Sequence, residues 1–282
     1  MLGALLPGRE KQSPLQFRDA VSRISQISGR IGGRAARPVR YAIALFRSIL
    51  FWFAFFVMSS ISSIGGVIAL PISHRGTIFF VRIWAQAHRI FCRFLLGQTI
   101  VVEGKMPDIP VLYVFKHESA FETVEQPMLF KHPAVFAKEE LFSIPVWGQA
   151  ARFYGLIPVD RDGGGKAMRA MLGAAKAALA AGRPLVLFAE GTRVPHGEAP
   201  PLRPGFAGMY RLLNIPVIPV AVNSGLAFPP RRWVKWPGTI TYKIGETIPA
   251  GLPREDAEAR VRVAINALNP PEALLAGETS NT

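Results

Sequence analysis

Two short polar segments, each following an apolar run, carry the residues best suited to chemistry. In the first, Lys-His-Glu-Ser-Ala-Phe-Glu at 116–122, His117 precedes Glu122 by five positions. We expect His117 in a strand-to-helix turn and Glu122 in the first turn of the helix, where the carboxylate can fold back onto the imidazole. Such a carboxylate fixes the tautomer of the ring and stabilises the imidazolium, which leaves the other nitrogen free to act as a general base.

Glu122 also has a purely structural explanation. Ser119 is the expected N-cap of the helix, and Ser119-x-x-Glu122 has the spacing of a capping box. The two roles can coexist. The sequence leaves open whether Glu122 serves the cap, the chemistry or both.

The second segment, Leu-Phe-Ala-Glu-Gly-Thr-Arg at 187–193, ends an apolar strand with Glu190, Gly191, Thr192 and Arg193. Thr192 and Arg193 could hold a phosphate, and Glu190 could accept a hydrogen bond from an alcohol. A turn with a surface ion pair explains this segment equally well when it is taken alone. Together with a base and its orienting acid, it indicates group transfer to a phosphorylated alcohol.

Two further segments are less informative by themselves. Arg161 ends Gly-Leu-Ile-Pro-Val-Asp-Arg at 155–161 and precedes a helix start, a place that favours a phosphate. A surface ion pair beside a glycine linker explains it as well. Pro216 and Pro219 bound an apolar strand, and rigidity at the strand entry is a better explanation for them than direct chemistry.

The elements that must position these residues alternate from about residue 99. Strand-like runs occupy 99–102, 110–115, 134–137, 157–159, 184–188, 217–222 and 239–244, and helical patterns fall near 119–130, 146–153, 165–181, 205–213 and 253–268. This alternation predicts an α/β fold with helices on both faces of the sheet. Because function in such sheets lies at the carboxyl ends of the strands, His117, Arg161 and Glu190 should converge on one edge.

The N-terminal part has a different composition. The chain of 282 residues carries a net charge of +14, and half of this excess lies in the first 47 residues, which hold nine basic and two acidic side chains. We expect residues 1–40 to form a basic flexible tail, either disordered or held on anionic lipid. From Ser48 to Ser73 no residue is charged, which suits a transmembrane segment, although the serines and glycines within it also fit a bend.

The helix that follows carries Arg82, Gln86, Arg89 and Arg93 on one face and apolar side chains elsewhere. This pattern suits a helix lying in a membrane interface, and a helix packed on the domain is the alternative. Both flanks of the apolar run are basic, so the positive-inside rule does not favour a crossing. We therefore favour a two-helix membrane anchor over 41–98 that enters one leaflet and returns, with a true span left open.

Several classes of site are disfavoured. Cys92 is the single cysteine, so the chain has no internal disulfide and no Cys-rich metal site. The histidines show no His-x-x-x-His pairing, which argues against zinc, and we expect no metal. The basic residues concentrate in the tail and anchor and are not interleaved with aromatics over the α/β part, which argues against a nucleic-acid partner. A non-catalytic, basic membrane-binding protein remains as an alternative from a different class.

Taken in order, the four segments resemble the sequence blocks of the glycerolipid acyltransferases, the 1-acylglycerol-3-phosphate acyltransferases. Those blocks are His-x4-Asp, Gly-x5-Arg, Phe-Pro-Glu-Gly-Thr-Arg and a Pro-rich strand. In this chain the corresponding segments are, in the same order, His117–Glu122, Gly155–Arg161, Phe188–Arg193 and Ile215–Pro219. The match runs from about 112 to 222. Glu122 replaces the usual Asp and Ala189 the usual Pro. Lys138, in Ala-Lys-Glu-Glu-Leu, resembles a lysine-bearing segment between the first two blocks.

The resemblance implies a mixed, mostly parallel sheet over residues 99–269, behind a two-helix anchor, with a loose tail at 270–282. It implies acyl transfer from a thioester donor, acyl-CoA or acyl-ACP (acyl carrier protein), to the sn-2 hydroxyl of lysophosphatidic acid, giving phosphatidic acid for phospholipid biosynthesis. Another lysophospholipid or a lyso-aminolipid is the alternative acceptor. No tightly bound cofactor is implied. The expected location is the inner membrane of a bacterium, with the catalytic domain on the cytoplasmic face.

The resemblance also implies a role for each matching residue. His117 would be the catalytic base and Glu122 its orienting acid. The phosphate and glycerol of the acceptor would be held by Lys138, Arg161, Glu190, Gly191, Thr192 and Arg193. Pro216 and Pro219 would be structural or line the acyl pocket.

Overall fold

The computed structural model describes the backbone of residues 14–160 and 163–276, and the side chains of 38–160 and 163–274. The chain divides into two units, Met1–Phe46 and Arg47–Thr282, with the boundary inside the first helix. The sheet, the helices that cover it and the candidate site all belong to the second unit.

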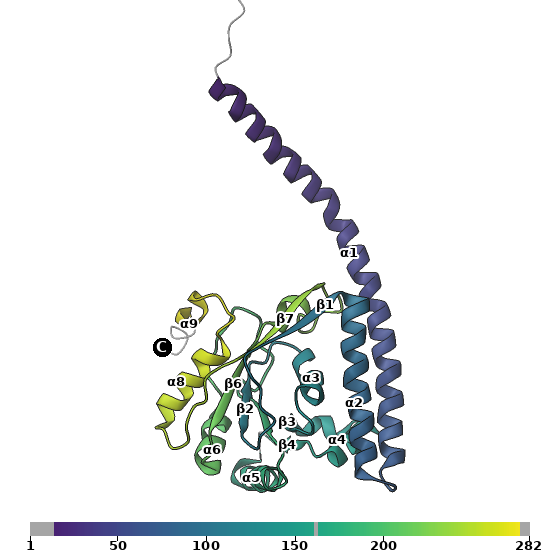
Figure 1. Ribbon diagram of the computed structural model, residues 1–282, viewed down its shortest axis with the longest axis vertical. Helices are drawn as coiled ribbons and strands as arrows, with labels where there is room; N and C mark the ends of the chain where they lie inside the picture. Colours follow the sequence, from purple (N-terminus) through teal and green to yellow (C-terminus); the bar gives the residue numbers. More distant parts are fainter. Residues whose placement is uncertain (1–13, 161–162, 277–282) are drawn as a thin grey trace, which may run out of the picture. The chain divides into compact units, whose positions relative to one another are not determined.

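A single mixed sheet is the centre of this unit, with seven strands among the described residues in the order β1-β7-β6-β2-β5-β3-β4 (Figure 1). They are β1 (Gln98–Glu103), β2 (Leu112–Phe115), β3 (Ala134–Lys138), β4 (Ile157–Val159), β5 (Leu185–Phe188), β6 (Val217–Val222) and β7 (Gly238–Ile244). From β6 to β4 all neighbours are parallel, whereas β7 pairs with β6 in the antiparallel sense and β1 runs parallel to β7. All the strand-like runs are strands, and the expected mixed, mostly parallel α/β sheet is confirmed.

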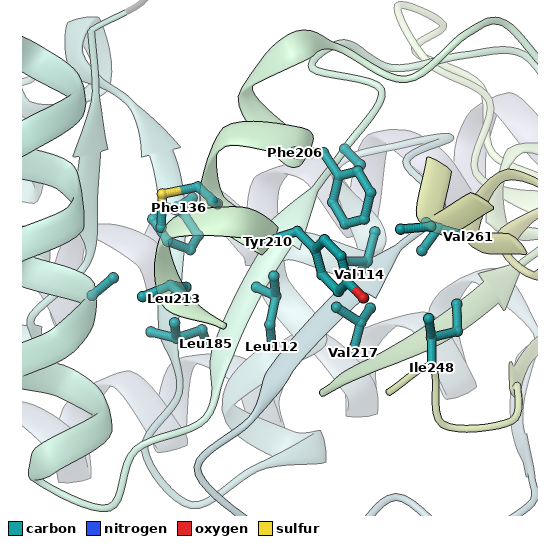
Figure 2. Packing of buried hydrophobic residues seen from close by; sticks show 14 of the residues in the cluster. Leu112, Val114, Phe136, Leu185, Phe206, Tyr210, Leu213, Val217, Ile248 and Val261 are labelled. Atoms are coloured by element: carbon teal, nitrogen blue, oxygen red, sulfur yellow. The ribbon is translucent and has the colours of Figure 1, made fainter. Parts of the chain in front are cut away.

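The two faces of the sheet have separate hydrophobic cores, because successive side chains of a strand point to opposite faces. On one face Leu112 and Val114 of β2 join Leu185 of β5 and Val217 of β6 (Figure 2). Tyr113, next to Leu112 in the sequence, belongs to the core on the other face. Every residue of β2 is buried, which explains why this central strand is a continuous apolar run.

Helices cover both faces, as the alternation of the sequence predicts. One face carries α5 (Gly164–Ala180), α6 (Pro204–Leu213) and α8 (Arg254–Ile265), and the other carries α3 (Phe121–Leu129) and the N-terminal helices. The helix α4 (Trp147–Tyr154) is also close to its expected position. Two short helices were not expected, α7 (Ser224–Ala227) after β6 and α9 (Glu272–Ala276) in the segment predicted to be a loose tail. Residues 277–282 of that tail lie outside the described residues.

The first helix, α1 (Pro14–Ala69), begins much earlier than the sequence suggests. The expected flexible tail over 1–40 is helical in its backbone from Pro14 onward, and its first 13 residues lie outside the described part. Frequent Arg residues and several Ala residues favour helix, and this preference outweighs the glycines at 29, 32 and 33. The stretch Pro38–Ala69 is long and apolar enough to cross a membrane by length and composition, and few of its side chains are buried.

From Arg47 onward, α1 lies alongside α2 (His74–Phe91), which continues into the π-helical turn η1 (Cys92–Leu96) (Figure 1). Phe55 of α1 meets Trp84 with ring centroids 5.9 Å apart, and the Trp84 indole N–H donates to the Ser59 hydroxyl over 2.8 Å. On the other side, α1 packs onto the domain itself, because the fully buried Phe51 contacts Phe228. The expected two-helix segment is therefore present.

An ion pair joins α2 to α3. Glu125 of α3 is fully buried and accepts two hydrogen bonds at Oε2 from Arg89, at 2.6 and 3.0 Å. Its Oε1 lies 3.4 Å from Nδ1 of the buried His88. Arg89, expected on the polar face of an interfacial helix, is thus bonded to the domain. Because Glu125 is one helical turn after Glu122, this pair also holds the helix that carries a candidate catalytic residue.

We expect Arg89→Met to lower the free energy of unfolding by about 3 kcal/mol, because the buried Glu125 would lose its bidentate partner while Arg89 itself is about one-third exposed. Thermal unfolding in detergent measures the change. The matched control is Arg93→Met, which removes an exposed arginine near the same helix end and should change stability by less than about 1 kcal/mol. Equal effects of the two substitutions would show that the Arg89–Glu125 pair does not stabilise the α2–α3 contact.

Candidate active site

The candidate site lies at the carboxyl ends of three neighbouring strands, β6, β2 and β5. The turns that follow β2 and β5 are joined by hydrogen bonds. The Val194 N–H donates to the His117 carbonyl oxygen over 2.7 Å, and the His117 N–H donates to Glu190 Oε2 over 3.0 Å. His117 and Glu190 therefore meet at one edge of the sheet, as expected, although they are far apart in the sequence.

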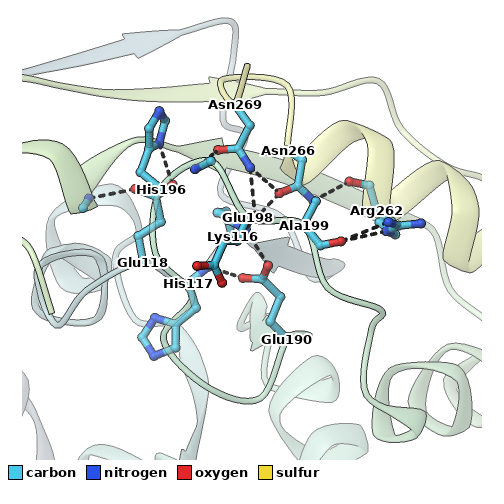
Figure 3. A network of polar contacts seen from close by, with 12 residues as sticks. Lys116, His117, Glu118, Glu190, His196, Glu198, Ala199, Arg262, Asn266 and Asn269 are labelled. Carbon is cyan, nitrogen blue, oxygen red and sulfur yellow. Dashed lines mark hydrogen bonds and ion pairs between the residues drawn. The ribbon is translucent and has the colours of Figure 1, made fainter. Parts of the chain in front are cut away.

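His117 and Glu122 form a hydrogen-bonded pair. Nδ1 of His117 lies 3.0 Å from Glu122 Oε1, and the Glu122 side chain is fully buried whereas that of His117 is 15% exposed. The imidazole packs on the Phe188 ring, with centroids 4.3 Å apart. Nε2 has no hydrogen-bond partner among the described residues, and Figure 3 shows the ring turned away from the neighbouring polar network. Nε2 is thus the atom that is free to exchange a proton.

The Glu122 carboxylate is surrounded by donors. Oε1 accepts the backbone N–H groups of Glu118 and Ser119, at 2.6 and 2.7 Å, in addition to His117 Nδ1. Oε2 accepts the hydroxyls of Ser119 and Ser224, at 2.9 and 2.6 Å. Burial by itself would raise the pKa of Glu122, but the His117 ring and these hydroxyl and amide donors lower it below the ordinary value. The carboxylate stays ionised and can stabilise an imidazolium at His117.

The alternative explanation of Glu122 holds at the same time. The Ser119 N–H donates to Glu122, and the Ser119 hydroxyl accepts the Phe121 N–H over 3.1 Å. These are the reciprocal bonds of a helix start, although α3 begins at Phe121, with Ala120 and not Ser119 at the cap position. The Glu122 carboxylate therefore both caps the start of the helix and supports the His117 ring.

A buried ion pair that the sequence did not reveal lies behind His117. Lys116 is fully buried, and its Nζ donates to Glu190 Oε1 at 2.6 Å, to the Glu198 carbonyl at 2.7 Å and to Asn266 Oδ1 at 2.8 Å (Figure 3). The other oxygen of Glu190 accepts the His117 N–H. Burial raises the pKa of Glu190, and Lys116 opposes this shift. Glu190 thus positions the backbone of His117.

A second histidine–carboxylate pair adjoins the first. Glu118 is fully buried, its Oε1 lies 2.9 Å from His196 Nδ1, and its Oε2 accepts the Gly225 N–H over 2.7 Å (Figure 3). Burial raises the pKa of Glu118 even though His196 and this N–H lower it. Glu118 therefore ties the turn after β2 to both the turn after β5 and the start of α7. The charge of Glu118 beside His117 was the available signal in the sequence, but its partners His196 and Gly225 lie 78 and 107 residues away.

The residues predicted to bind the phosphate of the acceptor differ in how accessible they are. Lys138 ends β3 at the same edge of the sheet, is half exposed and lies 3.8 Å from Glu140. Thr192 and Arg193 are exposed in the turn after β5. Arg161 lies outside the described residues. Lys138 and Arg193 are accessible to a ligand in this arrangement.

Gly191 and the two prolines have backbone roles. Gly191 has a φ of 66°, a left-handed conformation that glycine adopts without strain, and its N–H donates to the Phe188 carbonyl over 3.0 Å. Pro216 is exposed just before β6, at the opposite end from the site, whereas Pro219 is buried inside that strand. Both prolines shape the strand and neither reaches the carboxyl edge where His117 lies.

The comparison with family models identifies this region. Residues 99–223 match the family model described as Acyltransferase, and the matched stretch contains His117, Glu122 and Glu190. This part of the chain is similar to the acyltransferase family. The resemblance of its four segments to the blocks of glycerolipid acyltransferases is thereby confirmed.

Three proteins similar to this chain carry the name 1-acyl-sn-glycerol-3-phosphate acyltransferase. The Pseudomonas aeruginosa protein is 30% identical over 169 residues, 57% of this chain and 66% of that protein. The Cocos nucifera protein is 26% identical over 153 residues, 53% and 50% of the two chains. The Helicobacter pylori protein is 38% identical over 107 residues, 37% and 44% of the two chains. The chain therefore spans between 44% and 66% of the lengths of these relatives.

A solved structure has the same fold. It is the 1-acyl-sn-glycerophosphate (LPA) acyltransferase PlsC from Thermotoga maritima, which superposes with a TM-score of 0.63 at 22% identity. The superposition covers 82% of this chain and 97% of the other chain. The mixed sheet and its covering helices are thus an acyltransferase fold.

We expect Lys116→Met to lower the free energy of unfolding by about 3–5 kcal/mol, because it leaves the Glu190 charge buried without a partner. Lys138→Met is the matched control and should cost no more than about 1 kcal/mol, because its ion pair is exposed. Thermal unfolding of both variants in detergent measures the difference. If Lys116→Met were as stable as the control, the buried pair would not support the turn that carries His117.

Proposed function

We propose that this protein is a membrane-bound 1-acylglycerol-3-phosphate acyltransferase, which moves an acyl group from a thioester to the sn-2 hydroxyl of lysophosphatidic acid and makes phosphatidic acid. The observation that carries the proposal is the His117–Glu122 pair, with an ionised, buried carboxylate on one side of the ring and a free Nε2 on the other. The names of the relatives support the choice of acceptor.

The geometry suits direct transfer. Nε2 of His117 takes the proton of the acceptor hydroxyl while its oxygen attacks the thioester carbonyl, and Glu122 stabilises the resulting imidazolium. Collapse of the tetrahedral intermediate breaks the carbon–sulfur bond, and the leaving thiolate takes the proton from His117. The hydroxyls of Ser119 and Ser224 are both committed to Glu122, and Cys92 is buried in the helix pair. These placements favour transfer without an acyl-enzyme intermediate.

The acceptor phosphate would be held by basic residues around this edge. Lys138, Arg161 and Arg193 are the proposed ligands, with Gly191 and Thr192 setting the glycerol. Glu190 acts through His117 in this proposal, because both of its oxygens are already bonded. We propose no tightly bound cofactor or metal. The donor is acyl-CoA or acyl-ACP, since both present the same phosphopantetheine thioester.

We further propose that α1 and α2 anchor the protein to one leaflet, with the acyltransferase domain on the cytoplasmic face of a bacterial inner membrane. Part of the apolar stretch supports this arrangement, because Phe51 is buried against the domain and the Trp52 indole N–H donates to the Trp233 carbonyl over 2.9 Å. A helix tied to the domain over these turns is not free to cross the bilayer there. Exposed apolar residues such as Phe53, Phe79 and Phe94 remain for lipid.

Two substitutions test the proposed dyad. We expect His117→Ala to abolish acyl transfer to lysophosphatidic acid, and Glu122→Gln to lower kcat about 100-fold or more at little change in KM. Glutamine can keep one oxygen for the Glu118 and Ser119 N–H groups and donate to the Ser119 and Ser224 hydroxyls, so the fold should survive while the charge is lost. Initial rates and melting temperatures are measured together. A fully active His117→Ala protein would contradict the mechanism.

The acceptor is tested with matched lysolipids. We expect transfer to lysophosphatidic acid to exceed transfer to monoacylglycerol of the same chain by at least about 100-fold in kcat/KM, because several charge-assisted bonds to the phosphate would be lost. Product formation is followed in detergent with acyl-CoA and, separately, with acyl-ACP. Equal rates with the two acceptors would exclude phosphate recognition, and transfer only to another lysolipid would replace the proposed acceptor.

A further inference from the structure

A cavity of about 290 Å³ lies beside the dyad and is lined by residues outside the four sequence blocks. The connection between α7 and β7 supplies Phe228, Trp233 and Lys235, and α1 supplies Trp52. Ala120, just before α3 and three residues after His117, also lines the cavity, so that it adjoins the proposed catalytic base.

The charge of the cavity is entirely positive. Arg193, Arg231, Arg232 and Lys235 line it, and no carboxylate does. Among the described residues, none of these four cations forms an ion pair with a carboxylate. Like charges gathered in this way repel one another, and a bound anion would remove the repulsion.

Lys235 shows this repulsion most clearly. It is 3% exposed, its Nζ donates to the Pro229 carbonyl over 2.8 Å, and it lies 4.0 Å from the centroid of the Phe228 ring and 5.4 Å from that of Trp52. Burial, and then the nearby charge of Arg193, lower the pKa of Lys235 to about 8. A buried ammonium with aromatic rings and one carbonyl, but no counter-charge, is expensive unless an anion joins it.

The loop that carries these cations is held in place. The Lys235 N–H donates to the Ser48 hydroxyl over 2.8 Å, and the Trp236 N–H donates to the Ala227 carbonyl over 2.8 Å. Pro229 and Pro230 restrict the backbone that precedes Arg231. The cations are thus presented on a pre-formed surface, and little ordering is needed when a ligand binds.

We propose that Lys235, with Arg193, Arg231 and Arg232, forms a subsite for the phosphate ester of a substrate, whose apolar stem lies on Trp52 and Phe228. This inference deepens the proposed function and rests on it. Two phosphate esters are chemically suitable, the phosphomonoester of the lysolipid acceptor and the phosphate groups of the thioester donor's carrier arm. The cavity holds a head group and not a complete lipid or coenzyme, because its volume is at the low end for ligand pockets.

Equilibrium binding of one substrate at a time tests the subsite without any turnover. The full-length protein in detergent is titrated with lysophosphatidic acid, with acyl-CoA and with monoacylglycerol as the phosphate-free ligand. We expect Lys235→Met to weaken binding of one of the two phosphate ligands by about 10-fold or more and to leave monoacylglycerol unchanged. The ligand that weakens identifies the source of the phosphate. Lys243→Met, an exposed lysine on β7 away from the cavity, is the matched control.

A second variant covers a failure of Lys235→Met to fold. Arg231→Gln combined with Arg232→Gln changes two exposed side chains and should weaken the same ligand. Unchanged affinity of folded variants for both phosphate ligands would overturn the subsite even if acyl transfer proceeds. Conversely, Lys235-dependent binding in a protein that transfers no acyl group would uphold the subsite and overturn the proposed activity.

Discussion

The buried carboxylate of Glu122 is the group on which the rest of the site depends. Its two oxygens accept bonds from the turn after β2, from the His117 ring and from Ser224 beyond β6, so that one charge orders three segments. A charge with no access to water is tolerated only when its bonds are complete. The turn, the start of α3 and the end of β6 must therefore stay together, and this requirement fixes the position of His117.

A second buried charge, that of Lys116, restrains the turn after β2 through the backbone of His117. Lys116 holds Glu190, which holds the His117 backbone, and it also bonds Asn266, which follows α8. His117 is thus held through its ring by Glu122 and through its backbone by Glu190. A side chain fixed in both ways needs little further ordering when a ligand binds. The polar cluster lies at the sheet edge because the parallel strands β2 and β5 both end there.

Local patterns in the sequence predicted the sheet and the contact between His117 and Glu122, and the reasons are physical. Fully buried strands such as β2 are continuous apolar runs, and the His117–Glu122 pair spans only one turn. The Lys116, Glu118 and Ser224 contacts could not be predicted in the same way, because their partners are brought near only by the order of the strands. The helical backbone before residue 40 differs from the expected flexible tail, because glycines and a high density of like charge indicate flexibility in a sequence even where the backbone is helical.

The position of α1 brings one of its aromatic side chains next to the candidate site. Trp52 contacts the loop that carries Lys235, and both line the cavity beside Ala120. An apolar wall supplied by α1 and a positive wall supplied by a surface loop match a molecule with one apolar and one anionic end. Such a molecule leaves the bilayer only at a cost of about 0.8 kcal/mol for each methylene exposed to water. The cavity where α1 meets the domain covers the apolar end of such a molecule while its anionic end lies near His117.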